Sequence, residues 1–245
     1  MKKFWKWVMN EASVPDNTGQ ELPARTLVLN STIAEESWFD DDVTPALFAE
    51  ELNAGEGDIT VYINSPGGDC FAAARIYNML RDYKGKVTVQ VDALAASAAS
   101  VIAMAGDTVL VSPVSMIMVH NPATIAMGDH TEMEKAIAML DEVKNSIINA
   151  YQVKTGLSRQ KLSQLMEDET WMNARRAVEL HFADAITERA DQQDADVSDS
   201  LLFARKPFVQ QVTNRVNAHF NREEPMPAIN AAELYDRLKT IKDHF

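Results

Sequence analysis

The chain contains the run Ala93-Leu-Ala-Ala-Ser-Ala-Ala-Ser-Val-Ile-Ala-Met-Ala-Gly106, in which small apolar residues surround Ser97. A strand-like segment, Val87-Thr-Val-Gln-Val91, leads directly into this run. The order predicts that Ser97 lies where a buried strand turns into a helix. Free N–H groups and a partial positive charge at a helix N-terminus suit a nucleophile and the oxyanion that it creates. On this stretch alone, a serine that packs or caps the helix is the better interpretation.

A second unit of the same kind precedes it, Asp58-Ile-Thr-Val-Tyr-Ile-Asn-Ser-Pro-Gly-Gly-Asp69, followed by an apolar pattern with helical spacing. The paired glycines, Gly67 and Gly68, allow backbone angles and a close approach that a side chain would forbid. Two consecutive strand–turn–helix units with short connections imply a parallel pair of strands. Ligands of such sheets bind beyond the carboxyl ends of the strands, so we expect both turns to face one crevice.

A third strand-like segment, Ser115-Met-Ile-Met-Val-His-Asn-Pro122, ends at a histidine just before Asn-Pro breaks the pattern. Of the five histidines in the chain, only His120 follows such a strand. A histidine in this position is usually structural when it stands alone, but here Ser97 supplies a proton donor. His120 is therefore the natural general base.

These three segments resemble the Clp protease proteolytic subunits, which carry Tyr-Ile-Asn-Ser-Pro-Gly-Gly, Ala-Ala-Ser and Met-Ile-His-Gln-Pro in this order. The matching residues are 62–68, 95–97 and 119–122, and the resemblance extends over about residues 25–189. It implies an α/β fold of repeated β-β-α units in a superhelix, shared with the crotonase-like proteins. It also implies a serine endopeptidase that hydrolyses peptide bonds through an acyl-enzyme.

Carried over residue by residue, the resemblance makes Ser97 the nucleophile, His120 the general base, and the N–H groups of Gly68 and Ala98 the oxyanion hole. The chemistry fits these roles, because a serine hydroxyl is a weak nucleophile until a base removes its proton. The usual Ser-Met-Gly-Ala of the family is Ser97-Ala-Ala-Ser100 here. Only the backbone of Ala98 is needed for an oxyanion hole.

The acidic member of the triad is open between two neighbouring residues. In the segment Glu167-Asp-Glu-Thr-Trp-Met-Asn-Ala174, alignment with the family without a gap puts Glu169 where an aspartate is expected. Asp168, one residue earlier, has the expected chemistry, but glutamate also serves in such triads on other folds. The alternative is that these acidic residues simply begin a helix, where negative charge is favourable.

Composition limits the classes of function. The chain has 245 residues, 46% of them apolar and 24% charged, which is typical of a soluble domain with one substantial core. Its net charge of −13 argues against nucleic acid as the main partner. No apolar run reaches the ~18 residues that cross a bilayer, and we find no pattern for a metal or another cofactor. The single cysteine, Cys70, fits a reducing cytoplasm and is more simply buried filler than a nucleophile.

The chain divides into three parts. Residues 1–24 are expected to form a flexible polar arm, residues 25–190 the protease domain, and residues 191–245 a polar linker with a helical C-terminal extension. Within the domain, strands are expected near residues 26–30, 59–64, 87–92, 108–112 and 116–120. A long helix is expected over about residues 131–155.

In the family, the equivalent of this long helix is the handle through which two heptameric rings interlock. The resemblance therefore implies homo-oligomeric rings, as a heptamer or a tetradecamer. The alternative is a helix that merely covers the sheet.

The leading functional hypothesis is a phage head maturation protease of the Clp type, which cleaves capsid or scaffold precursors in the host cytoplasm or the prohead. It rests on two features: no counterpart of the loop that engages an ATPase precedes Arg25, and a segment extends beyond the family core. The alternative is an ATP-dependent Clp protease proteolytic subunit in general protein degradation, with an AAA+ unfoldase as partner. Less favoured are a crotonase-like acyl-coenzyme A enzyme and an inactive capsid or scaffold component.

Overall fold

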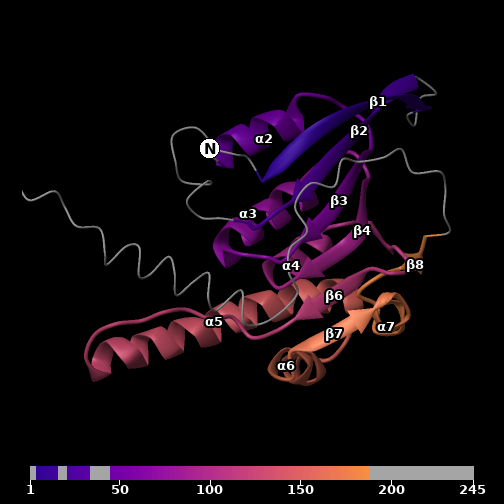
Figure 1. The fold of residues 1–245 in the computed structure, drawn as a ribbon. Coiled ribbons are helices and arrows are strands. Elements are labelled where there is room, and N and C mark those ends of the chain that lie inside the picture. The colour runs from indigo at the N-terminus through magenta and orange to yellow at the C-terminus, as the bar shows by residue number, and fades with distance from the viewer. Residues whose placement is uncertain (1–3, 16–20, 34–44, 188–245) are drawn as a thin grey trace, which may run out of the picture. The chain divides into compact units, whose positions relative to one another are not determined.

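The computed structural model describes residues 4–15, 21–33 and 45–187 (Figure 1). They belong to the first of two units of the chain, Met1–Asp191. The helical extension expected over residues 191–245 lies outside the described residues. None of the described helices combines the length and the apolar character needed to span a bilayer.

The described strands form one eight-stranded, mostly parallel sheet. Its main path runs through β1 (Trp5–Pro15), β2 (Glu21–Asn30), β3 (Ile59–Ser65), β4 (Val87–Ala96), β5 (Thr108–Val111) and β8 (Ala185–Ile186). β1 is antiparallel to β2, and the other neighbours on this path are parallel. The five strands expected from the sequence are all present, and the expected parallel pair β3 and β4 is confirmed.

Strand β4 changes neighbours along its length. Its residues 88–91 pair with β5, whereas residues 94–96 pair in parallel with β6 (Met116–Val119). β6 in turn pairs antiparallel with β7 (Thr170–Asn173). β4 thus pairs with β5 along its first part and with β6 at its end. This mixed α/β architecture confirms the expected fold class.

Helices cover the sheet and extend beyond it (Figure 1). They are α2 (Pro45–Asn53), α3 (Cys70–Arg81), α4 (Ala98–Ala103), α5 (His130–Thr155), α6 (Arg159–Glu167) and α7 (Ala174–Glu179). All six residues of α4 are buried, and this explains the small side chains around Ser97. A helix enclosed by the core on all sides has no room for larger ones.

The long helix expected over residues 131–155 is confirmed as α5, which begins after its N-cap Asp129 and ends at Gly156 with a φ of 69°. Only its last turns enter the core, through residues such as Ile148 and Tyr151. The first half extends away from the sheet in Figure 1, and its Ile137 is 61% exposed. The described part of the chain therefore does not use this half of α5 as a cover for the sheet.

The N-terminal segment differs from the flexible arm expected over residues 1–24. Residues 5–15 form β1, and β2 begins at Glu21 rather than near residue 26. Two aromatic side chains explain the difference, since Phe4 and Trp5 are each only 3% exposed. The Trp5 ring packs edge-on against Phe48 of α2 at 5.2 Å between ring centroids. The free energy gained by burying these two aromatic rings outweighs the polar character that the lysines give to the segment.

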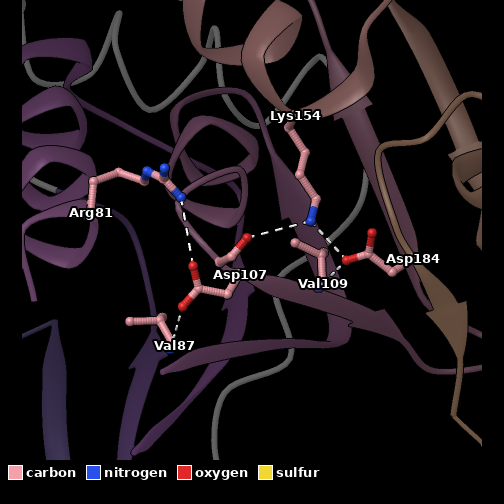
Figure 2. Close-up of polar contacts among 7 residues, drawn as sticks. Arg81, Val87, Asp107, Val109, Lys154 and Asp184 are labelled. Atoms are coloured by element: carbon pink, nitrogen blue, oxygen red, sulfur yellow. Dashed lines mark hydrogen bonds and ion pairs between the residues drawn. The ribbon is translucent and has the colours of Figure 1, made fainter. Parts of the chain in front are cut away.

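A polar cluster joins the end of α5 to the amino-terminal ends of β4 and β5 (Figure 2). Lys154 Nζ donates to Asp184 Oδ2 at 2.7 Å and to the carbonyl of Gly106 at 3.4 Å. The same Asp184 oxygen accepts from the Val109 N–H at 2.6 Å. The neighbouring Asp107 accepts from the backbone N–H of the first residue of β4 at 2.9 Å. The Asp184 carboxylate thus binds both α5, through Lys154, and β5, through Val109.

Replacing this carboxylate tests its role. Asp184→Ala leaves the Val109 N–H and the Lys154 ammonium, whose side chain is 11% exposed, without their shared acceptor. We expect the free energy of unfolding in urea to fall by about 1–3 kcal/mol. The control is Glu179→Ala, which removes the exposed ion pair with Arg176 on α7 and should cost about 0–0.5 kcal/mol. Equal losses in the two variants would contradict this account of the cluster.

Candidate active site

Ser97 occupies the sharp turn between β4 and α4, with a φ of 55° and a ψ of −126°. A non-glycine residue with positive φ costs about 1–3 kcal/mol and persists only where its surroundings enforce it. The Ser97 N–H donates to the carbonyl of Met118 on β6 at 2.9 Å, and the Ser97 carbonyl accepts from the Ser100 N–H at 3.0 Å. Hydrogen bonds therefore hold both the N–H and the carbonyl of Ser97 in the strained turn.

His120 follows the last residue of β6, and its Nε2 lies 2.7 Å from Ser97 Oγ. The sheet produces this contact, because β6 runs parallel to the end of β4 with Met118 beside Ala96. For the hydroxyl proton to pass to Nε2, this nitrogen must be the unprotonated one, with the ring proton on Nδ1. The structure thus joins a serine and a histidine that are separated by 23 positions in the sequence.

The two acidic candidates lie differently. β7 pairs with β6 so that Thr170 faces Val119, the residue before His120. Glu169 directly precedes β7, in a turn with a φ of 46°. Asp168 instead ends α6 on the exposed side, where both of its carboxylate oxygens accept from Gln164 Nε2 at 2.9 Å. Glu169 is thus the acidic residue adjacent to the strand that pairs with β6, whereas the Asp168 carboxylate is engaged with its own helix.

The glycine turn packs directly against the serine turn. A Cβ added to Gly67 would lie 2.6 Å from the Ala96 carbonyl oxygen, 2.7 Å from Ser97 Cβ and 2.9 Å from the Ala98 nitrogen. Gly67 also has a φ of 94°. Only glycine permits both this conformation and this approach.

Gly68 follows with a φ of 150°, and a Cβ there would lie 1.7 Å from the Ile33 carbonyl oxygen. The backbone of Ile33 bonds to the residues on either side of Gly68. Its N–H donates to the Gly67 carbonyl at 2.9 Å, and its carbonyl accepts from the Asp69 N–H at 2.8 Å. Neither of these bonds uses the N–H of Gly68. Ala98, as the first residue of α4, also has an N–H without an acceptor in its helix. The two donors lie on the two turns that meet beside Ser97, and together they can bind an oxyanion.

Ser65, which is not among the residues predicted from the sequence, holds the glycine turn. Its Oγ donates to the Ser31 carbonyl at 2.6 Å and accepts from the Gly67 N–H at 3.2 Å. The Ser-Pro-Gly sequence carried a signal, because serine hydroxyls bond to the backbone two residues on in such turns. The contact of Ser100 with Tyr151 was also not predicted, because no spacing in the sequence gives a signal for it.

Cys70, the first residue of α3, lies two residues after Gly68. Burial raises the pKa of its thiol above the ordinary value, and the adjacent Asp69 carboxylate raises it further. The thiol therefore stays protonated at neutral pH and is a poor nucleophile. Among the described residues, no group of three or more His, Cys, Asp or Glu side chains is arranged to hold a metal ion.

Comparison with known proteins adds to this geometry. The family model for Clp protease matches residues 10–190 of the chain. An ATP-dependent Clp protease proteolytic subunit of Deinococcus radiodurans is 27% identical over 156 residues, which cover 63% of this chain and 76% of that protein. ATP-dependent Clp protease proteolytic subunit 2 of Treponema denticola is 31% identical over 160 residues, covering 64% and 79%. A subunit of the same name from Bacteroides fragilis is 30% identical over 142 residues, covering 57% and 68%.

The matched region spans the glycine turn, the serine turn, His120 and Glu169, and so includes the whole candidate site. Within it, a strained serine contacts a histidine beside two backbone N–H donors. The chain therefore belongs to the Clp protease family and is a Clp-type serine peptidase.

Proposed function

We propose that this chain hydrolyses peptide bonds in polypeptides through an acyl-enzyme formed on Ser97. The observation that carries the proposal is the 2.7 Å contact between Ser97 Oγ and His120 Nε2, located where the glycine and serine turns meet. A serine in contact with a histidine, beside two backbone N–H groups, supports the proposal because acyl transfer requires a nucleophile, a base and oxyanion donors.

The reaction proceeds in two steps. His120 Nε2 takes the Ser97 proton while Oγ attacks the carbonyl carbon of the substrate, and the N–H groups of Gly68 and Ala98 bind the oxyanion. His120 then gives its proton to the departing amine, which leaves the substrate acyl group on Oγ. A water molecule, deprotonated by His120, releases this acyl group and restores the Ser97 hydroxyl.

We propose Glu169 as the group that orients His120. A carboxylate at Nδ1 holds the imidazole in the tautomer that leaves Nε2 free to accept a proton, and it stabilises the imidazolium formed during the reaction. The support is the pairing of β6 with β7, in which Val119, the residue before His120, faces Thr170, the residue after Glu169. Asp168, with its carboxylate bound to Gln164, is better explained as the end of α6.

For the biological setting, we favour general protein degradation over phage head maturation. The three relatives described above are each named as proteolytic subunits of ATP-dependent Clp proteases. Their names support a proteolytic subunit of an ATP-dependent protease, and we propose a cytoplasmic enzyme that receives unfolded chains from an AAA+ unfoldase. Phage head maturation, the leading hypothesis from the sequence, has no support in these relatives. The crotonase-like alternative requires no serine–histidine pair at these positions, so the 2.7 Å contact argues against it.

We also propose that copies of the chain assemble into rings, as a heptamer or a pair of heptamers. The exposed half of α5 supports this, because it carries Ile137 at 61% and Met139 at 44% exposure. Apolar side chains on an extended helix mark an interaction surface.

Serine chemistry is tested with Ser97→Ala and Cys70→Ala. We expect Ser97→Ala to lower kcat/KM for casein-derived peptides by at least about 1,000-fold and to abolish labelling by a fluorophosphonate, because the attacking oxygen is lost. Cys70→Ala should remain within about threefold of the wild type, since a protonated thiol contributes no nucleophile. Serine chemistry is wrong if the alanine variant at position 97 keeps its activity.

The two acidic residues are separated by Glu169→Gln and Asp168→Asn. The first change removes the charge that stabilises the imidazolium and should lower kcat by about 100-fold to 10,000-fold. The second breaks only the contact with Gln164 and should leave kcat within about threefold. The reverse order of effects would assign the role to Asp168.

Ring assembly is tested by sedimentation of the full chain and of Ile137→Glu. The wild type should sediment as a heptamer or tetradecamer, and a buried unpaired carboxylate at the interface should shift it to smaller species. Glu142→Gln, at an exposed position of the same helix, is the matched control and should leave the assembly unchanged. A wild-type monomer at micromolar concentration would contradict ring assembly.

The biological setting is tested by mixing the protein with ATP, an AAA+ unfoldase of the Clp type and a tagged folded substrate. We expect degradation to require all three together with Ser97, because a closed chamber excludes folded chains. If the unfoldase neither binds nor stimulates the protein, while a capsid precursor is cleaved without ATP, phage head maturation is the correct setting.

A further inference from the structure

Two buried hydroxyl groups lie beneath the serine turn. Ser100, in the first turn of α4, has no exposed surface, and Tyr151, near the end of α5, is 1% exposed. Ser100 Oγ donates to the carbonyl of Ser97 at 2.6 Å and lies 2.8 Å from Tyr151 Oη. The other residues of α4 are Ala, Val and Ile, so this hydroxyl pair interrupts an otherwise apolar helix. The reaction described above uses neither side chain.

The direction of these hydrogen bonds follows from proton counting. A carbonyl oxygen only accepts, so the single proton of Ser100 Oγ goes to Ser97. Tyr151 must then donate to Ser100. Burial raises the pKa of Tyr151 above its ordinary value, although the bond to Ser100 partly opposes this, and the phenol keeps its proton at neutral pH. A directed chain therefore runs from Tyr151 through Ser100 to the backbone of Ser97.

The position of this chain matters because the carbonyl of Ser97 and the N–H of Ala98 belong to one rigid peptide plane. Fixing the carbonyl oxygen on one side fixes the direction of the N–H on the other. The Ser97 N–H is held by Met118 on β6, and the Ser97 carbonyl accepts from the Ser100 N–H at 3.0 Å. The Ser100 hydroxyl adds a second and shorter bond to this carbonyl and so restricts rotation of the plane further. A positive φ at Ser97 makes the turn costly without such bonds.

We propose that Ser100 and Tyr151 are positioning residues, which fix the Ser97–Ala98 peptide plane and so aim the Ala98 N–H at the oxyanion. Tyr151 acts only through Ser100. The inference rests on the function proposed above, since it assigns the hydroxyl pair to the same site. It also makes the nucleophile turn depend on how the end of α5 is seated in the core.

The test is a double-mutant cycle of Tyr151→Phe and Ser100→Ala, measured with a fluorogenic peptide. Tyr151→Phe keeps the ring and its edge-on contact with Phe182, at 5.3 Å between centroids, and removes one proton donor. We expect kcat to fall about 3-fold to 10-fold with KM unchanged, because the donor N–H acts on the transition state. Ser100→Ala should lower kcat by about 10-fold to 100-fold. In the Ser100→Ala background, Tyr151→Phe should have no further effect on kcat.

The matched control is Ser115→Ala. Ser115 is 1% exposed, and its Oγ donates to the carbonyl three residues earlier, that of Ser112, at 2.9 Å. This variant loses the same kind of buried bond away from the serine turn, and its kcat should stay within about twofold. The proposal is overturned if Tyr151→Phe leaves kcat unchanged in the wild type, or lowers it equally in both backgrounds.

A second readout separates this proposal from the proposed function. With ¹³C placed in the backbone carbonyl of serine, the Ser97 resonance should shift in Ser100→Ala and stay fixed in Ser115→Ala. A wild type without Ser97-dependent hydrolysis or fluorophosphonate labelling would overturn the proposed function, whatever the resonance does. An unmoved Ser97 resonance in Ser100→Ala would overturn the positioning role, whatever the activity.

Discussion

The strained turn at Ser97 is the constraint on which the rest of the site depends. Its positive φ is tolerated because β6 holds the N–H through Met118 and α4 holds the carbonyl through Ser100. Gly67 packs so closely against the same turn that a Cβ added to it would lie within about 3 Å of the atoms of the turn. Ser97, the proposed oxyanion donors and His120 thus share one fixed frame.

The change of neighbours along β4 creates this frame. Because the end of β4 pairs with β6 instead of β5, the histidine after β6 comes beside the serine after β4. β7 then adds to β6 in antiparallel register, with Glu169 directly before its first residue. This arrangement requires a helix, α4, whose six residues are all buried and whose first residues, next to Ser97, are alanines. The small residues next to Ser97, the pairing of β4 with β6 and the contact of Ser97 with His120 are therefore linked.

Much of the site could be predicted from the sequence, for reasons that apply to any parallel sheet. Ser97, Gly68 and His120 each follow a strand with a clear apolar pattern, and such strands end at one edge. Glu169 could not be separated from Asp168, because the choice depends on the pairing of β7 with β6, which the local sequence does not reveal. Strand β1 was missed because its aromatic contacts with α2 join distant segments. The bond of Ser100 with Tyr151 spans 51 positions and follows no periodic pattern.

The central claim is that Ser97 Oγ attacks a carbonyl whose oxygen is bound by the N–H groups of Gly68 and Ala98. The most direct test is a crystal structure of the protein with a peptide boronic acid, whose tetrahedral boronate resembles the intermediate of the reaction. The account predicts a covalent bond from Ser97 Oγ to boron, with one boronate oxygen about 2.7–3.1 Å from both nitrogens. A boronate attached elsewhere, or one bound to Ser97 with no oxygen near Gly68 and Ala98, would contradict it.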